Sequence, residues 1–127
     1  MNKKSQAILL VDEHPQRKTT LSSRLRMQGF TIDVARGGFH AVHLAEKNRY
    51  NLVMMIDDME DMPAQEALSL IRHSHDSASL PVLVMRSNGK ELDQSEEEYF
   101  REEQVNEILP WQEEFNSILR RIHHHLT

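Results

Sequence analysis

The sequence predicts an α/β fold built on a parallel sheet, as one domain covering residues 5–126. Apolar runs of no more than five residues alternate along the chain with segments whose apolar side chains recur at helical spacing. The central run, Leu52–Ile56, contains no polar residue, which is typical of a strand buried on both faces of a sheet. Five strands alternating with five helices favour right-handed crossovers between parallel strands.

The first half of the chain is punctuated by proline and glycine. Pro15 suits the first turn of a helix, where its missing N–H is not needed, and Gly29 supplies a helix stop. Gly37-Gly38 makes the next turn. The predicted elements are a strand at 7–11, a helix from 15 to the stop at 29, a half-exposed edge strand at 30–34, a helix around 41–45 and the strand at 52–56.

The second half repeats this alternation with less regular strands. Pro81 opens an apolar run that halts at Arg86, and Val105 begins a thin last strand. The acidic segment between these two strands is permissive for a helix. The predicted elements are a helix at 64–72, strands at 82–85 and 105–109, and helices at 91–103 and 111–126.

Composition excludes several classes of protein. The chain has no cysteine, which rules out disulfides, thiol catalysis and cysteine-based metal sites and fits a reducing cytoplasm. The net charge of −5 argues against a nucleic-acid surface. No apolar run is long enough to cross a membrane, and Asp12 interrupts the short N-terminal run that could imitate a secretion signal. We therefore expect a cytoplasmic protein without membrane insertion.

Carboxylates follow two of the predicted strands directly. Asp12 and Glu13 come after the first strand, and Asp57 and Asp58 come after Ile56 in the central strand. In an open parallel sheet, functional groups collect at the carboxyl ends of the strands. This edge is therefore the predicted functional site.

Three stretches together resemble the receiver domain of bacterial two-component response regulators. They are the first strand with its acidic pair, the Gly29-Phe30 junction that leads into an edge strand, and the segment from Tyr50 to Arg72. The resemblance covers about the whole chain. It implies a flavodoxin-like, three-layer (βα)5 fold with strand order 2-1-3-4-5.

The resemblance also implies a site. Family members are phosphorylated on an aspartate at the end of the third strand, which holds a magnesium ion together with the acidic pair. The pair is present as Asp12 and Glu13, but the phosphoacceptor position falls on Ile56. The residues that keep this register are Met59, Met62, Glu66 and Ile71.

Three further family features differ. A threonine or serine after strand four normally contacts the phosphoryl group, and that position falls on Arg86, with Ser87 one place further. A lysine after strand five normally does the same, but Lys90 is the last lysine of the chain. The family's Pro-Gly loop is replaced by Glu60-Asp61. The sequence therefore resembles a degenerate variant, a pseudo-receiver.

Asp57 offers an alternative acceptor if the strand shifts by one residue. Adjacent strand residues point to opposite faces, so Ile56 and Asp57 cannot both face the pocket. We therefore interpret Asp57 and Asp58 as solvated loop residues or helix caps. The favoured function is a phosphorylation-independent interaction module that is not an enzyme, and the alternative is a phosphoacceptor switch using Asp57 with Mg²⁺. A nucleotide- or small-ligand-binding domain is a further alternative, but no Gly-rich loop follows the first strand.

The metal predictions follow from the missing third carboxylate. Asp12 and Glu13 alone predict weak Mg²⁺ binding at most and no dedicated metal site or other cofactor. Arg86 is predicted to pair with these two carboxylates in place of the metal and the lysine. The tract His123-His124-His125 is interpreted as a frayed, solvated helix end.

The acidic segment before the last strand predicts a binding surface. In receiver domains this region contacts other proteins, and aromatic anchors beside carboxylates suit such a surface. We expect the partner to be another signalling or regulatory protein, with a homodimer as an alternative. The predicted surface residues are Glu96, Glu97, Tyr99, Phe100 and Trp111.

Overall fold

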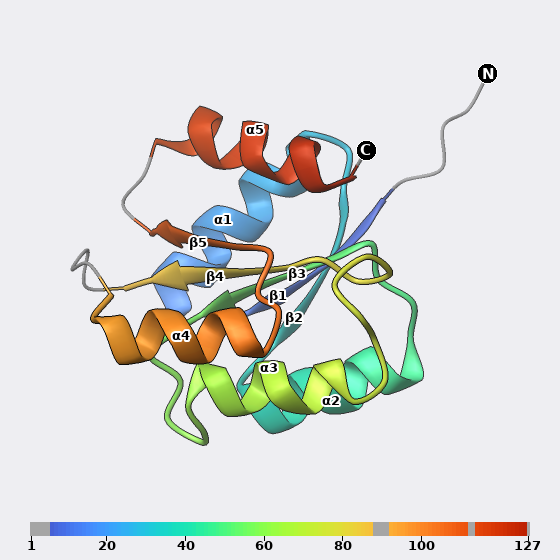
Figure 1. Cartoon of the computed structure of the whole chain (residues 1–127). Helices are drawn as coiled ribbons and strands as arrows, with labels where there is room; N and C mark the ends of the chain where they lie inside the picture. Colours follow the sequence, from blue (N-terminus) through green and yellow to red (C-terminus); the bar gives the residue numbers. More distant parts are fainter. Residues whose placement is uncertain (1–5, 88–91, 112–113, 127) are drawn as a thin grey trace.

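The apolar runs of the sequence form five parallel strands in one sheet, in the order β2-β1-β3-β4-β5. The structure is a computed structural model and describes residues 6–87, 92–111 and 114–126. Helices α1 and α5 cover one face of the sheet, and α2, α3 and α4 cover the other (Figure 1). The predicted three-layer fold and strand order are therefore confirmed.

Ten elements alternate along the chain. The strands are β1 (Ala7–Val11), β2 (Thr31–Ala35), β3 (Leu52–Ile56), β4 (Val82–Arg86) and β5 (Glu107–Pro110). The helices are α1 (Pro15–Met27), α2 (Gly38–Lys47), α3 (Ala64–Arg72), α4 (Gln94–Glu102) and α5 (Phe115–Leu126). Within the described residues, none of these helices is long and apolar enough to cross a membrane.

The boundaries of α4 and β5 differ from the prediction. α4 ends in a turn where Gln104 adopts a left-handed φ of 60° and the Val105 N–H donates to the Phe100 carbonyl at 3.0 Å. This is the closing bond that glycine usually permits at a helix end. The side-chain oxygen Oδ1 of Asn106 then accepts the Val82 N–H in place of a backbone carbonyl, so the strand begins only at Glu107. The predicted helices at 91–103 and 111–126 begin later, and residues 91, 112 and 113 of those predictions lie outside the described part.

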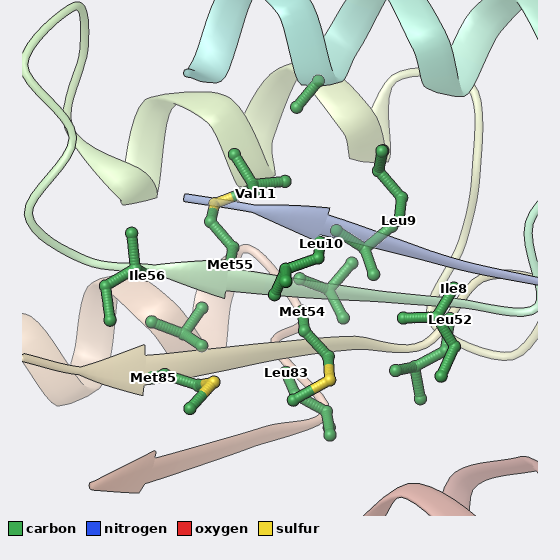
Figure 2. Packing of buried hydrophobic residues seen from close by; sticks show 14 of the residues in the cluster. Ile8, Leu9, Leu10, Val11, Leu52, Met54, Met55, Ile56, Leu83 and Met85 are labelled. Carbon is green, nitrogen blue, oxygen red and sulfur yellow. The ribbon is translucent and has the colours of Figure 1, made fainter. Parts of the chain in front are cut away.

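The core is centred on the three middle strands. Every residue of β3 and β4 is buried, and Figure 2 shows their side chains packed with those of β1. Ile56, at the end of β3, is 3% exposed and belongs to this core. The labelled core residues are Ile8, Leu9, Leu10, Val11, Leu52, Met54, Met55, Ile56, Leu83 and Met85.

Arg72, the last residue of α3, ties three segments together. Its guanidinium donates to the carbonyls of Leu80 at 2.8 Å and Gln104 at 2.8 Å, and to Oδ1 of Asn106 at 2.9 Å. Burial lowers the pKa of this guanidinium, while nearby Asp76 opposes the change. Arg72 therefore joins the end of α3 to the turns that precede β4 and β5.

The start of α2 is capped from a distant loop. Asp61 accepts hydrogen bonds from the N–H groups of Gly38 and Phe39, both at 3.0 Å. The approach is close, because a Cβ at Gly38 would lie 2.4 Å from Cγ of Met62. The glycine pair predicted as a turn thus also lets the loop after β3 contact α2.

Candidate functional site

The carboxyl ends of β1, β3 and β4 bring the predicted site residues to one edge of the sheet. Asp12 follows β1, Asp57 follows β3, and Arg86 ends β4. The loop after β3 adds Asp58, and α1 adds Arg17. The edge therefore holds two arginines among several carboxylates.

Arg17 occupies the acidic pocket. Its Nε donates to Oδ2 of Asp12 at 2.6 Å and its Nη2 to Oδ1 at 2.9 Å, a two-bond fork on a side chain that is 4% exposed. The same Nη2 reaches Oδ1 of Asp58 at 2.9 Å. The hydrogen bond to Asp12 raises the pKa of Arg17, although burial opposes this change. Arg17 is therefore a fixed positive charge in this pocket.

The start of α1 places Arg17. Pro15 begins the helix, and Nδ1 of His14 accepts the N–H of Arg17 at 3.2 Å as a cap. Arg17 then stands four residues before Leu21 and eight before Leu25, on the buried face of the helix. Its guanidinium also lies 5.7 Å from the ring centroid of Trp111.

Arg86 pairs with different carboxylates from those predicted. Its Nη1 lies 2.8 Å from Oε2 of Glu96 in α4, and its Nε lies 3.7 Å from Oδ2 of Asp57. The cation on Asp12 is Arg17, so the prediction assigned that role to the wrong arginine. The sequence carried a signal for the correct one, since a charged residue on the apolar face of a predicted helix needs a buried partner.

The interpretation of Asp57 as a solvated residue is also wrong. Its side chain is 15% exposed, and its Oδ1 accepts the N–H of Ser87 at 2.9 Å. Ile56 is in the core, and the Asp57 N–H donates to the Met85 carbonyl at 3.0 Å, which continues the β3–β4 pairing by one step. Asp57 is therefore a partly buried ion-pair partner at the site.

The remaining carboxylates of the edge are also engaged. Oε1 of Glu13 accepts the N–H of Glu60 at 3.0 Å, and Oδ1 of Asp12 accepts the N–H of His14 at 3.0 Å. Among the described residues, no three His, Asp or Glu side chains are placed to hold a metal ion. Magnesium needs several oxygens in near-octahedral geometry. The arrangement of donors at this edge does not fit that requirement.

The predicted binding surface is only partly exposed. Tyr99 is 44% exposed and Glu97 is exposed, whereas Phe100 is 1% exposed and lies in the core. The prediction that Phe100 is a surface anchor is therefore wrong. Its buried side chain instead fixes α4 on the sheet. Glu96 faces Arg86, and Trp111 is half-buried beside Arg17.

The histidine tract is helical rather than frayed, because α5 continues to Leu126. The His123 ring lies 5.7 Å from that of Phe30, centroid to centroid. His125 lies 3.8 Å from Glu107, and burial lowers the pKa of His125 below its usual 6.5. His123 and His124 are exposed, as the interpretation of a solvated helix end expects, whereas His125 is half-buried.

Comparisons with known proteins agree on one family. A family sequence model described as the response regulator receiver domain matches residues 8–122. The chain is 29% identical over 89 residues to the transcriptional activator protein PfeR of Pseudomonas aeruginosa, covering 70% of this chain and 28% of that protein. It is 27% identical over 84 residues to the sensor protein EvgS of Escherichia coli, covering 66% of this chain and 7% of that protein. The chain thus spans less than a third of either relative.

Solved structures share the fold. A CheY-like response regulator receiver domain protein from Methanospirillum hungatei superposes with a TM-score of 0.88 at 14% identity, over 97% of this chain and 94% of that one. The receiver domain of the sensor histidine kinase PA1611 from Pseudomonas aeruginosa gives 0.84 at 23% identity, over 97% and 98%. That second structure has a magnesium ion coordinated in its active-site cleft.

Proposed function

The chain belongs to the response regulator receiver domain family, and from this premise we propose that it acts as a phosphorylation-independent interaction module, folded as one domain over residues 5–126. Receiver domains are in general signalling modules rather than enzymes. The observation that carries the proposal is the placement of Arg17 and Arg86 on the carboxylates that a switch would need free.

The two arginines oppose both steps of a phosphorylation switch. An arginine in a protein does not lose its proton, so its charge stays on the carboxylate at any physiological pH. Magnesium would have to displace the fork of Arg17 from Asp12, and a phosphoryl donor would meet Asp57 already paired with Arg86. Ile56 at the expected acceptor position offers no oxygen. Weak Mg²⁺ binding at Glu13 and Asp12 is the most that this arrangement supports.

The partner that suits this domain is another signalling or regulatory protein in the cytoplasm. α4 presents Glu97 and Tyr99 to solvent, and the net charge of −5 disfavours nucleic acid. Glu96, which pairs with Arg86, joins this surface to the site, whereas Trp111 lies beside Arg17 and not on α4. A homodimer through the same face is the alternative assembly.

Incubation with acetyl phosphate and Mg²⁺, followed by intact-mass measurement, tests the proposal. The mass should stay unchanged, while an active receiver domain treated in parallel gains one phosphoryl group. A phosphoryl adduct that disappears in Asp57→Asn would overturn the proposal. An adduct that survives Asp57→Asn would indicate modification outside this site.

One observation favours the second candidate, a switch that uses Asp57 with Mg²⁺. Asp57 and Ser87 each stand one residue beyond the family positions, and they are joined by the 2.9 Å hydrogen bond. The backbone hydrogen bond from the Asp57 N–H to the Met85 carbonyl also extends the β3–β4 pairing to Asp57. The same mass measurement on Arg86→Ala shows whether the arginine alone blocks an otherwise competent acceptor.

A further inference from the structure

A cavity of about 340 Å³ lies between α1 and α5, over the end of β4. Its walls are mainly apolar, formed by Leu21, Met85, Trp111, Phe115 and Ile118. Two polar side chains of α1 complete it, and they are Thr20 and Arg24. Small-molecule sites share this composition, with apolar walls and few polar groups that orient the ligand.

Arg24 is a cation held at this cavity by an aromatic ring rather than by an acid. Its guanidinium carbon lies 4.1 Å from the centroid of the Phe115 ring. Within the described part of the chain, Arg24 has no carboxylate partner, unlike Arg17 and Arg86. Its N–H donors therefore stay available to an incoming anion.

We propose that this cavity binds a small apolar carboxylate, with the hydrocarbon group against the apolar walls and the carboxylate on Arg24. The hydroxyl of Thr20 supplies a second polar contact at the same side of the cavity. A guanidinium fork matches the two oxygens of a carboxylate, which a neutral ligand does not offer. The volume limits the ligand to a ring or branched chain with one acidic group, at the lower end of small-molecule sites. The inference is independent of the proposed function.

The site is coupled by contact to the acidic edge. Trp111 lines the cavity and also lies 5.7 Å from the guanidinium of Arg17, which holds Asp12. Met85 lines the cavity and directly precedes Arg86. A ligand seated here contacts side chains next to both arginines of the site.

Trp111 is the sole tryptophan of the chain, so its fluorescence reports on the cavity directly. The probe is cyclohexylacetate, compared with its neutral analogue 2-cyclohexylethanol; neither absorbs where tryptophan is excited. Cyclohexylacetate should change Trp111 emission saturably and shift the methyl resonance of Ile118. The alcohol should bind about tenfold more weakly, because a charge-assisted hydrogen bond is lost.

Variants separate the proposed contacts from general effects. Arg24→Gln should weaken the acid about tenfold and leave the alcohol unchanged. Arg120→Gln, an exposed arginine of α5 outside the cavity, should change neither. Ile118→Phe should abolish binding of the acid and of the alcohol, because the larger side chain fills the cavity. Thr20→Met, at the exposed rim of the cavity, should have the same effect without altering the core.

Three results would overturn the inference. The first is that neither Trp111 emission nor the Ile118 resonance responds to millimolar acid. The second is equal binding of acid and alcohol. The third is an Arg24→Gln variant that binds the acid as well as the natural chain does. None of these results would affect the phosphorylation measurement, so the two proposals fail separately.

Discussion

At the scale of single residues, the acidic edge depends on the pair formed by Arg17 and Asp12. Both side chains are almost fully buried, so each charge is compensated by the other rather than by water. Arg17→Ala leaves the Asp12 carboxylate buried without its cation, and we expect the free energy of unfolding to fall by about 3–5 kcal/mol. Urea titration followed by circular dichroism measures this change.

Two further variants show whether the effect comes from the buried charge. Arg36→Ala removes an exposed arginine and should change stability by less than about 0.5 kcal/mol. Replacing both partners, Arg17→Met with Asp12→Leu, should recover much of the loss, because an apolar pair needs no compensation. If the Arg17→Ala variant were as stable as Arg36→Ala, the buried charge of Asp12 would not need Arg17.

Most residues of this site can be predicted from the sequence, but their pairing cannot. Asp12, Asp57 and Arg86 all lie at the predicted edge, because strand ends follow directly from the apolar runs. Which cation meets which carboxylate depends on the rotation of α1 and the direction of long side chains. Arg17 was missed for that reason. Phe100 was misplaced because a helix with few apolar residues leaves its buried face undefined by periodicity.

At the scale of elements, Arg72 connects α3 with the turns before β4 and β5. Arg72→Ala should cost about 3 kcal/mol, because several carbonyl acceptors lose a charged donor. Arg72→Lys should restore little, since one ammonium cannot reach acceptors on three segments. Arg49→Lys, at an exposed position, is the matched control, and chemical denaturation provides the comparison. Full rescue by lysine would show that charge alone matters.

The cap that Asp61 provides for α2 should depend on pH. Burial alone would raise the pKa of Asp61, but the N–H groups of Phe39 and Gly38 outweigh it and lower the pKa below 3.8. The carboxylate therefore stabilises the fold above its unfolded pKa, and that contribution is lost as the pH falls through the folded value.

Asp61→Ala should accordingly cost about 1 kcal/mol at pH 7, as for loss of a helix cap, and progressively less as the pH falls below 3.8. Urea unfolding at pH 7 and at a series of acid pH values measures the difference. Glu60→Ala is the control at the neighbouring exposed residue. The backbone N–H of Glu60 donates to Glu13 and is kept in this variant, so it should show no such pH dependence. An Asp61→Ala penalty that persists unchanged in acid would point to a steric rather than an ionic role.

Element types could be predicted because the periodicity of apolar residues differs between strands and helices. Element ends were harder, since they depend on individual side chains. Asn106 delays β5 by bonding the Val82 N–H, and Gln104 closes α4 in a conformation that glycine usually supplies. Neither residue type signals that role by composition.

At the scale of the whole molecule, negative charge is concentrated on α4, which carries Glu96, Glu97, Glu98 and Glu102. Glu97→Lys with Glu98→Lys should weaken capture of a partner from extracts of the source organism several-fold, and should flatten its salt dependence. Glu46→Lys with Glu114→Lys changes net charge equally but lies away from α4, on α2 and before α5. Equal losses for both double variants would indicate a response to net charge and not to this surface.

The overall topology was predictable, whereas the spaces between its layers were not. Five strand–helix repeats and the resemblance together implied the strand order that the structure has. The cavity beside Trp111 depends on how far α5 stands from α1, which is set by the sizes of side chains from three elements. No local pattern in the sequence encodes that distance.

The placement of Arg17 and Arg86 has an evolutionary consequence. Ile56→Asp would put a carboxylate into the core, and loss of Arg17 first would leave the buried Asp12 carboxylate without its cation. These two steps towards a magnesium-dependent pocket are therefore disfavoured by folding stability. Selection can alter the exposed residues of α4 one at a time without that penalty. A lineage carrying this domain should diversify its partners far more readily than it regains phosphorylation.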